Sequence, residues 1–181
     1  RGPEEVINHA TKGEIPAAEA SRLRLGPDGF PIAYFARVSE YYRFQDNELE
    51  SLGQIEIDGE DRPIFEIVVS SDEVHGDGLF GIGAFPGIAQ HSDGKWTLQA
   101  VRDRQTPPMF DHAVAMADGT IFLNELNRND RKLRLWRFYK GRFEFVLEGI
   151  KSGQVEKMVA WGDGLFVQMN AGDRFGLEIR G

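Results

Sequence analysis

Three short turns recur along this sequence at a constant distance of 47 residues. They fall at Asp46, Asp93 and Lys140, and the differences 93 − 46 and 140 − 93 are both 47. Asn or Gly follows each of them, and these residue types accept the positive φ that a tight hairpin turn needs. Runs rich in Val, Ile, Leu and aromatic residues flank each turn, as they do in β-hairpins. This equal spacing indicates that one structural unit repeats.

The clearest copy of the unit occupies residues 109–149. We expect a four-stranded antiparallel meander there, with strands at 110–116, 120–126, 133–139 and 142–148. Similar runs predict strands before this copy at 21–25, 30–38, 41–45, 50–57, 63–70, 79–85, 88–91 and 95–102. Further strands are predicted after it at 154–161, 165–169, 170–174 and 175–180. The sequence therefore predicts an all-β protein of consecutive hairpins.

A four-stranded unit that recurs every 40 to 50 residues or so is typical of a β-propeller blade. The segment from Tyr42 to Glu50 also aligns residue by residue with the segment from Trp136 to Glu144. From about Ala20 onward the chain resembles β-propeller repeat proteins. One meander cannot cover its own apolar faces, so the resemblance implies sheets that stack face to face. A β-sandwich is the alternative fold, but it does not predict equal spacing.

One hairpin also resembles a more particular family. Ser92-Asp93-Gly94-Lys95-Trp96 is similar to the Asp-box hairpin of sialidase-like propellers, although it is one residue shorter and lacks a second Gly. We expect an N-terminal arm at 1–18 and blades at about 19–60, 61–106, 107–152 and 153–181, the last one incomplete. Its missing strand can come from the arm, or a further chain or segment completes a larger propeller.

Composition excludes several classes of function. The net charge of −8 argues against nucleic-acid partners and anionic membranes, which attract basic surfaces. The chain has no cysteine, so disulfides, thiolate nucleophiles and Cys-ligated zinc are absent. No apolar run approaches the roughly 20 residues of a membrane helix. The absence of cysteine fits both cytosolic and exported proteins, and we expect a secreted or periplasmic location.

In a propeller the first strand of each blade lines the central channel, and ligands bind where these strands begin. An acid beside a histidine at the channel mouth can do general acid–base work, and paired carboxylates can hydrolyse a glycosidic bond. Because neighbours in a regular strand point to opposite sides, Asp111 and His112 are not both expected to face the channel. The candidate catalytic residues are Asp111, His112, Glu156 and Asp61.

The loops between second and third strands share this face. Their candidate ligand-binding residues are Phe85, Asn124, Glu125, Arg128, Asn129, Asn170 and Arg174. We expect no metal site, because the four histidines are scattered and the polar stretch at 124–130 does not have the spacing of a calcium loop. No sequence motif indicates a cofactor.

These features lead to three hypotheses about function. The first is a binding module that recognises a carbohydrate or a protein partner on its loop face. The second is a glycoside-active enzyme, sialidase-like or another glycosidase, that uses carboxylates at the channel mouth. The third is a structural fragment that completes a larger propeller.

Overall fold

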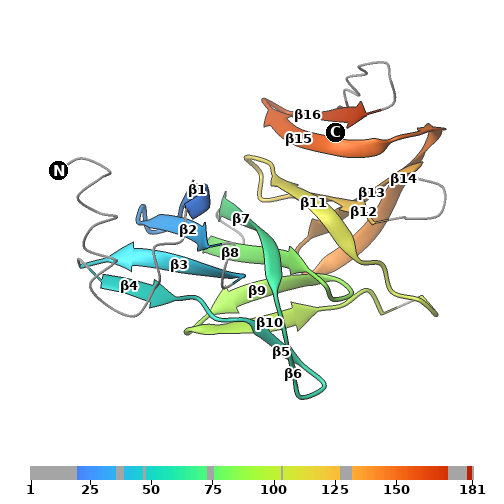
Figure 1. Ribbon diagram of the computed structural model, residues 1–181. Coiled ribbons are helices and arrows are strands. Elements are labelled where there is room, and N and C mark those ends of the chain that lie inside the picture. Colours follow the sequence, from blue (N-terminus) through green and yellow to red (C-terminus); the bar gives the residue numbers. More distant parts are fainter. Residues whose placement is uncertain are drawn as a thin grey trace.

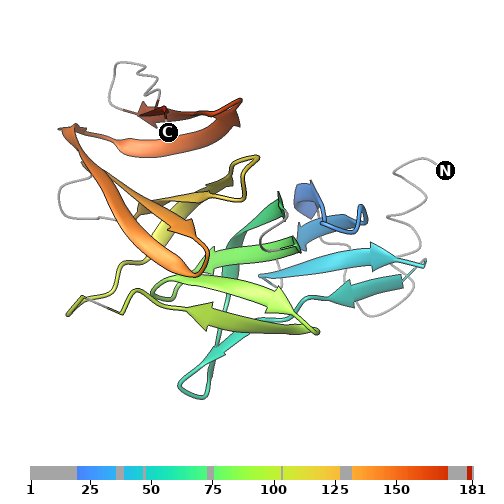
Figure 2. The same cartoon turned by 180° about the vertical axis from the view of Figure 1, so that it is seen from behind.

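The computed structural model describes residues 20–35, 39–46, 48–72, 76–102, 104–126, 132–170 and 179–180. Within these ranges every regular element is a β-strand, and the strands form successive antiparallel sheets. Among them is no helix long and apolar enough to cross a membrane. The sheets follow one another around an arc in the order of the sequence (Figure 1, Figure 2).

Three of the sheets are four-stranded meanders. The first consists of β1 (Ala20–Leu25), β2 (Pro31–Phe35), β3 (Glu40–Gln45) and β4 (Glu48–Ser51). The second consists of β7 (Ile64–Asp72), β8 (Gly76–Gly83), β9 (Ile88–Ser92) and β10 (Lys95–Gln99). The third consists of β11 (Phe110–Ala115), β12 (Ile121–Glu125), β13 (Lys132–Tyr139) and β14 (Arg142–Ser152).

The fourth sheet contains β15 (Gln154–Trp161), β16 (Gly164–Asn170) and β17 (Ile179–Arg180), paired in that order. Of the strand predicted at 170–174 only Asn170 is described, as the last residue of β16. The arm predicted at 1–18 lies outside the described residues. In each of the four sheets the first strand is at one edge, and the strands that follow pair outward in sequence order.

The hairpins between third and fourth strands explain the regular spacing of the sequence. Asp46, Asp93 and Lys140 have φ angles of 52°, 51° and 50°. Residues other than glycine rarely adopt such angles, and they do so mainly in tight turns. The 47-residue spacing therefore marks the same backbone turn in three successive sheets.

One predicted strand is wrong. The run at 50–57 was expected to be continuous, but β4 ends at Ser51 and β5 (Ile55–Ile57) pairs with β6 (Glu60–Arg62) in a separate hairpin. The Ser51 hydroxyl accepts a hydrogen bond from the Gly53 amide at 2.9 Å, and Gly53 has a φ of +70°. This turn directs Leu52 into the core, where it is 3% exposed. The β5–β6 hairpin projects away from the four sheets in both views (Figure 1, Figure 2).

The core lies between consecutive sheets. One buried cluster joins the first and second sheets through residues such as Ile32 and Ile67. A second cluster joins the second and third sheets, with Phe80 facing Phe138. A third joins the third and fourth sheets through Leu135 and Leu165. Apolar surface is thus buried at every interface between neighbouring sheets, which is how propeller blades pack and differs from the single interlayer core of a sandwich.

Candidate functional site

The first strand of every sheet is bulged near its beginning. The pairing register shifts after the first ladder residue in β1, β7 and β11 and after the second in β15. A bulge inserts one unpaired residue, bends the strand and redirects side chains. The inserted residues are Ser21, Phe65, Asp111 and Glu156, and the next residues are Arg22, Glu66, His112 and Lys157.

Asp111 and His112 lie side by side. The Nδ1 atom of His112 is 3.1 Å from Oδ1 of Asp111, and both side chains are about one-fifth exposed, at 23% and 22%. The expectation that strand alternation separates these two side chains is therefore wrong, because the bulge falls on Asp111 and interrupts the alternation. The structure forms a carboxylate–imidazole pair at the beginning of β11.

Asn124 holds this pair from the neighbouring strand. Its Nδ2 atom donates a hydrogen bond of 2.7 Å to Oδ1 of Asp111, and its Oδ1 accepts one of 3.4 Å from the Arg134 amide. Asn124 is 4% exposed, so it supports Asp111 from beneath and offers little surface to a ligand. Since Asn124 pairs with His112 in the ladder, one residue positions both members of the pair.

The surroundings of His112 favour its protonated form. Burial alone lowers the pKa of His112, but the Asp111 carboxylate, the charge of Glu66 and a hydrogen bond to the backbone of Glu156 raise it further than burial lowers it. The net pKa of His112 is therefore raised above its usual 6.5. An imidazole of this kind is a proton donor at a pH where a free histidine is largely neutral.

Glu66 is a further acid of this site and is not among the candidate residues predicted from the sequence. Burial raises the pKa of Glu66 above its usual 4.5, against the opposing effect of His112, Arg22 and Arg24. The carboxylate of Asp111 acts in the same direction as burial. Glu66 thus lies between the arginines of the first sheet and the Asp111–His112 pair of the third.

A repeated contact joins successive first strands. In the first sheet, Arg22 Nη1 donates a hydrogen bond of 2.5 Å to the carbonyl of Phe65, the bulged residue of the second sheet. The Tyr41 hydroxyl donates to the same carbonyl at 3.0 Å. In the third sheet, a hydrogen bond to the backbone of Glu156, the bulged residue of the fourth sheet, helps to raise the pKa of His112. At these two interfaces the residue after one bulge therefore contacts the backbone of the next bulge.

These residues define what we call the mouth face, the side of the molecule on which the first strands begin. Arg104, in the connection between β10 and β11, belongs to it. Its guanidinium lies 4.8 Å from the centre of the Trp136 ring and 3.5 Å from Glu125. Glu125 in turn accepts a 2.8 Å hydrogen bond from Trp136 Nε1. The mouth face is thus a mixed surface of cations, carboxylates and one covered tryptophan.

The structure brings together three of the predicted residues, Asp111, His112 and Asn124. Glu125, next to Asn124 on β12, contacts Trp136 and Arg104 instead. Glu156 is exposed and accepts a 2.7 Å hydrogen bond from Gln168. Asp61 lies on the exposed β5–β6 hairpin, which is separate from the four sheets.

The remaining predicted residues have different surroundings. Phe85 is 1% exposed and packs in the core. Asn170 is exposed at the end of β16. Arg128, Asn129 and Arg174 lie outside the described residues.

A signal for the missed residues exists in the sequence. Arg22, Glu66, His112 and Lys157 follow one another at distances of 44, 46 and 45 residues (66 − 22, 112 − 66 and 157 − 112). Aligning the four first strands on this spacing places a charged or titratable residue at one repeated position. Among the described residues no three His, Asp or Glu side chains cluster closely enough to hold a metal ion.

Comparison with known proteins identifies the fold. No protein-family model matches the sequence, and no curated protein matches it. Among solved structures, the chain is similar to YCF48 bound to D1 peptide, with a TM-score of 0.60, 12% identity and coverage of 88% of this chain and 51% of that one.

Two further solved structures are similar at the same level. Catalytically inactive virginiamycin B lyase from Staphylococcus aureus with quinupristin has a TM-score of 0.51 and 13% identity, with coverage of 88% of this chain and 66% of that one. A putative 6-phosphogluconolactonase from Bacteroides fragilis has a TM-score of 0.53 and 13% identity, with coverage of 89% and 53%.

These structures are β-propeller-like, and the four stacked sheets of this chain are β-propeller blades. The chain spans between 51% and 66% of the length of these three solved chains. Identities of 12% and 13% define the fold and not the activity. The likeness of the Ser92–Trp96 hairpin to sialidase-like blades is not shown by these similarities.

Proposed function

We propose that this protein is a β-propeller binding module that recognises a peptide segment of a protein partner on its mouth face. The observation that carries the proposal is the joining of Glu66, Asp111 and His112 by bulges in successive first strands. The two carboxylates can accept hydrogen bonds from peptide N–H groups, and the imidazole can donate one to a peptide carbonyl. Arg22 and Arg24 add donors on the side of the first sheet.

The apolar groups around this cluster favour a peptide over a sugar. Phe65, Met109 and Phe145 are 46%, 41% and 41% exposed, and Met and aromatic residues are enriched in protein interfaces. Trp136, the side chain best suited to stack on a sugar ring, is only 5% exposed and is covered by Arg104. A carbohydrate would therefore find no open tryptophan platform here.

One solved propeller supports this choice at the level of the fold. The structure of YCF48 contains a bound D1 peptide. A propeller of similar architecture is thus compatible with peptide recognition, although the identity of 12% carries no residue roles to this chain.

The test is selection of peptides from a displayed random library on the full chain, followed by measurement of Kd by calorimetry. Asp111→Asn and Glu66→Gln keep the shape of each side chain and remove its charge, and each should weaken a selected peptide about tenfold or more. Asp61→Asn, on the separate β5–β6 hairpin, is the matched control and should leave Kd unchanged. Failure to select any peptide, together with binding on a glycan array, would favour the carbohydrate hypothesis.

Glycoside hydrolysis is a second candidate, favoured by one observation. Burial raises the pKa of Glu66, and the charge of Asp111 acts in the same direction. A general acid with a raised pKa near a second carboxylate is the usual requirement for this reaction. In this hypothesis Glu66 is the general acid in place of the predicted Asp61 and Glu156. Asp61 lies on the β5–β6 hairpin, and Glu156 bonds to Gln168. Turnover of chromogenic glycosides that Asp111→Asn and Glu66→Gln abolish would establish the enzyme.

We also propose that additional blade-like sheets cover the two ends of the stack. On the first sheet Leu23 and Leu25 are 66% and 67% exposed, and on the fourth Trp161 is 76% exposed. Leu23 and Leu25 alternate along β1 with Arg22 and Arg24, which interact with Glu66 of the second sheet. They therefore point away from that sheet, so apolar side chains remain where a neighbouring blade would pack.

A further inference from the structure

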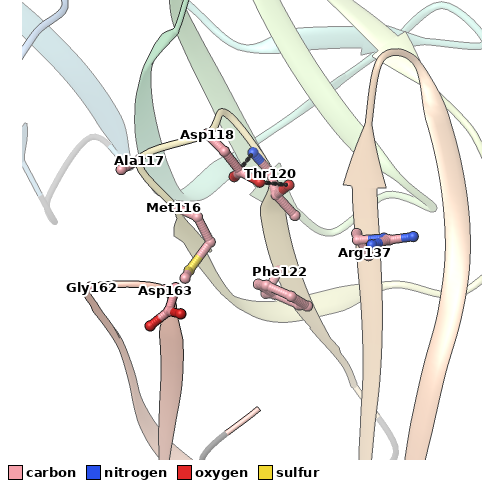
Figure 3. Close-up of a pocket in the computed structure, with 8 residues that line it drawn as sticks. All are labelled: Met116, Ala117, Asp118, Thr120, Phe122, Arg137, Gly162 and Asp163. Atoms are coloured by element: carbon pink, nitrogen blue, oxygen red, sulfur yellow. Dashed lines mark hydrogen bonds between the residues drawn. The ribbon is translucent and has the colours of Figure 1, made fainter. Parts of the chain in front are cut away.

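A pocket lies on the opposite side of the molecule from the mouth face, between the third and fourth sheets. It encloses about 380 Å³ and is formed where the turn from β11 to β12 approaches the turn from β15 to β16. Figure 3 shows Asp118 and Asp163 on either side of the Met116 side chain, with Phe122 beside them and Arg137 further along β13. We call this side the turn face. It is separate from the mouth face and from the function proposed there.

Among the described residues, the Asp118 carboxylate accepts hydrogen bonds only from neutral groups. Its Oδ1 accepts a 2.9 Å hydrogen bond from the Thr120 amide, and its Oδ2 accepts one of 3.1 Å from the Thr120 hydroxyl. Each carboxylate oxygen can accept a second hydrogen bond. Asp163 is exposed on the other wall. The pocket therefore presents two carboxylates above an apolar floor.

The first sheet contains the same turn, but there the carboxylate has a different hydrogen-bond partner. Asp28 precedes Asp118 by 90 residues (118 − 28), and its Oδ1 accepts a 3.1 Å hydrogen bond from the Phe30 amide, 90 residues before Thr120. Position 30 offers no hydroxyl, and Oδ2 of Asp28 instead accepts a 2.7 Å hydrogen bond from Nη1 of Arg43. At this repeat-related site the carboxylate holds a guanidinium of the chain itself.

The corresponding arginine of the third sheet has another partner. Arg43 is paired in the ladder with Glu50, and Arg137 occupies the same place opposite Glu144. Arg43 Nε stays 3.9 Å from Glu50 while Arg43 binds Asp28. Arg137 instead forms a close ion pair with Glu144. Asp118 consequently lacks the guanidinium that Asp28 has, although the turn that holds it is the same.

We propose that the pocket of the turn face binds a guanidinium group on an aliphatic stem, such as the arginine side chain of a ligand. The guanidinium takes the place at Asp118 that Arg43 takes at Asp28, and Asp163 supplies a second negative charge. The stem lies on Met116 and Phe122, where the ring face also favours a cation. A fork of N–H donors suits a carboxylate better than a point charge does.

Other ligand classes fit the lining less well. An anion would meet two carboxylates and an arginine whose charge Glu144 already neutralises. A neutral sugar would leave the charge of Asp163 without a counterion, and it would gain nothing from the apolar surface of Met116. The excess of negative charge over this floor is what selects an organic cation.

The test is a ¹H–¹⁵N NMR titration of the full chain with N-acetyl-arginine methylamide at low salt. For one side chain in an open pocket we expect a Kd on the order of millimolar, with shifts at 116–122 and 162–163. The citrulline analogue has the same shape without the charge and should bind at least tenfold more weakly. Asp118→Asn and Asp163→Asn should each weaken binding of the arginine probe several-fold. Asp163 has no partner among the described residues whose loss would disturb the fold.

Asp93→Asn is the control, because it removes an exposed acid from the pocket of the first two sheets that contains Asp28, where the Arg43 guanidinium already pairs with Asp28. Its Kd should equal that of the unmodified protein. The proposal is overturned by equal binding of the citrulline analogue, by unchanged binding in both Asp118→Asn and Asp163→Asn, by an equal loss in Asp93→Asn, or by preferential binding of a neutral sugar.

Discussion

The imidazole of His112 lies 3.1 Å from the carboxylate of Asp111, although the two residues are consecutive in β11. The contact exists because Asp111 is the bulged residue of the strand. Bulges of the same kind recur in β1, β7 and β15. Arg22, after the bulge of β1, contacts the backbone of Phe65, and His112, after the bulge of β11, contacts the backbone of Glu156. The charged cluster of the mouth face is therefore a product of the repeat.

The pH dependence of stability should reveal the His112 contact. Asp111, Glu66 and the Glu156 backbone together raise the pKa of His112 above 6.5 despite burial. The folded state therefore binds the proton more tightly than the unfolded state, so the stabilisation is complete below pH 6.5 and is lost as pH rises through the folded pKa. Urea unfolding should show that His112→Gln is destabilising at pH 5.5 to 6 or so and much less so at about pH 8.5.

His91 provides a control of opposite sign. Burial, followed by the charge of Arg43, lowers the pKa of His91 below 6.5. Its stabilising contribution is therefore complete above pH 6.5 and is lost as pH falls. The difference in free energy of unfolding between His91→Gln and the unmodified protein should therefore become smaller at low pH. Parallel profiles for the two variants would contradict the assignment. Glu66 changes stability with pH in the same direction as His112, but at lower pH, because burial raises the pKa of Glu66.

Replacing Asn124 should destabilise the third blade. Asn124→Leu fills a similar volume but removes a 2.7 Å hydrogen bond to Asp111 and the acceptor of the Arg134 amide. Leaving such buried groups unpaired costs about 1–3 kcal/mol, which urea unfolding would detect. Asn170→Leu, at the exposed end of β16, should change the free energy of unfolding by less than about 0.5 kcal/mol. A cost as small for Asn124→Leu would mean that the amide supports nothing.

Two glycines should separate backbone strain from steric exclusion. Gly94 has a φ of +73° with open space where a Cβ would lie, whereas Gly87 has a φ of +112° and a Cβ there would be 2.2 Å from the Gln99 carbonyl oxygen. Gly94→Ala should cost roughly 1–2 kcal/mol from its left-handed backbone alone. Gly87→Ala adds a clash with backbone that joins two blades, so its cost should be clearly greater. Equal costs would show that the Gln99 backbone moves freely.

The exposed ends of the stack should make the chain associate. Sedimentation velocity over a wide range of concentration should show assembly that Trp161→Asp weakens, because the charge falls on the uncovered face of the fourth sheet. The same substitution should hardly change the stability of the dilute monomer, since the Trp161 side chain is 76% exposed. Phe145→Asp is the control, because it places the same charge on the third sheet, and it should leave the assembly unchanged. A monomer at every concentration would contradict the proposal that further blades cover these faces.

The blades could be predicted from sequence because their signals are local. A positive φ at Asp46, Asp93 and Lys140 requires particular turn residues, and these stand at equal distances in the sequence. The bulges could not be predicted in the same way. One inserted residue leaves the apolar pattern of β7 or β11 almost unchanged, yet it decides that Glu66 and His112 belong to one cluster. The β5–β6 hairpin was missed because a single turn at Gly53 interrupts a run of strand-like residues.

The most direct test of peptide recognition is to map a selected peptide on the full chain by ¹H–¹⁵N NMR. We expect the largest shift changes at Glu66, Asp111, His112 and Arg104, and we expect no change at the turns that contain Asp118 and Asp163. Shift changes confined to the turn face, or spread evenly over the sheets, would contradict the assignment of the bulged first strands as the binding site.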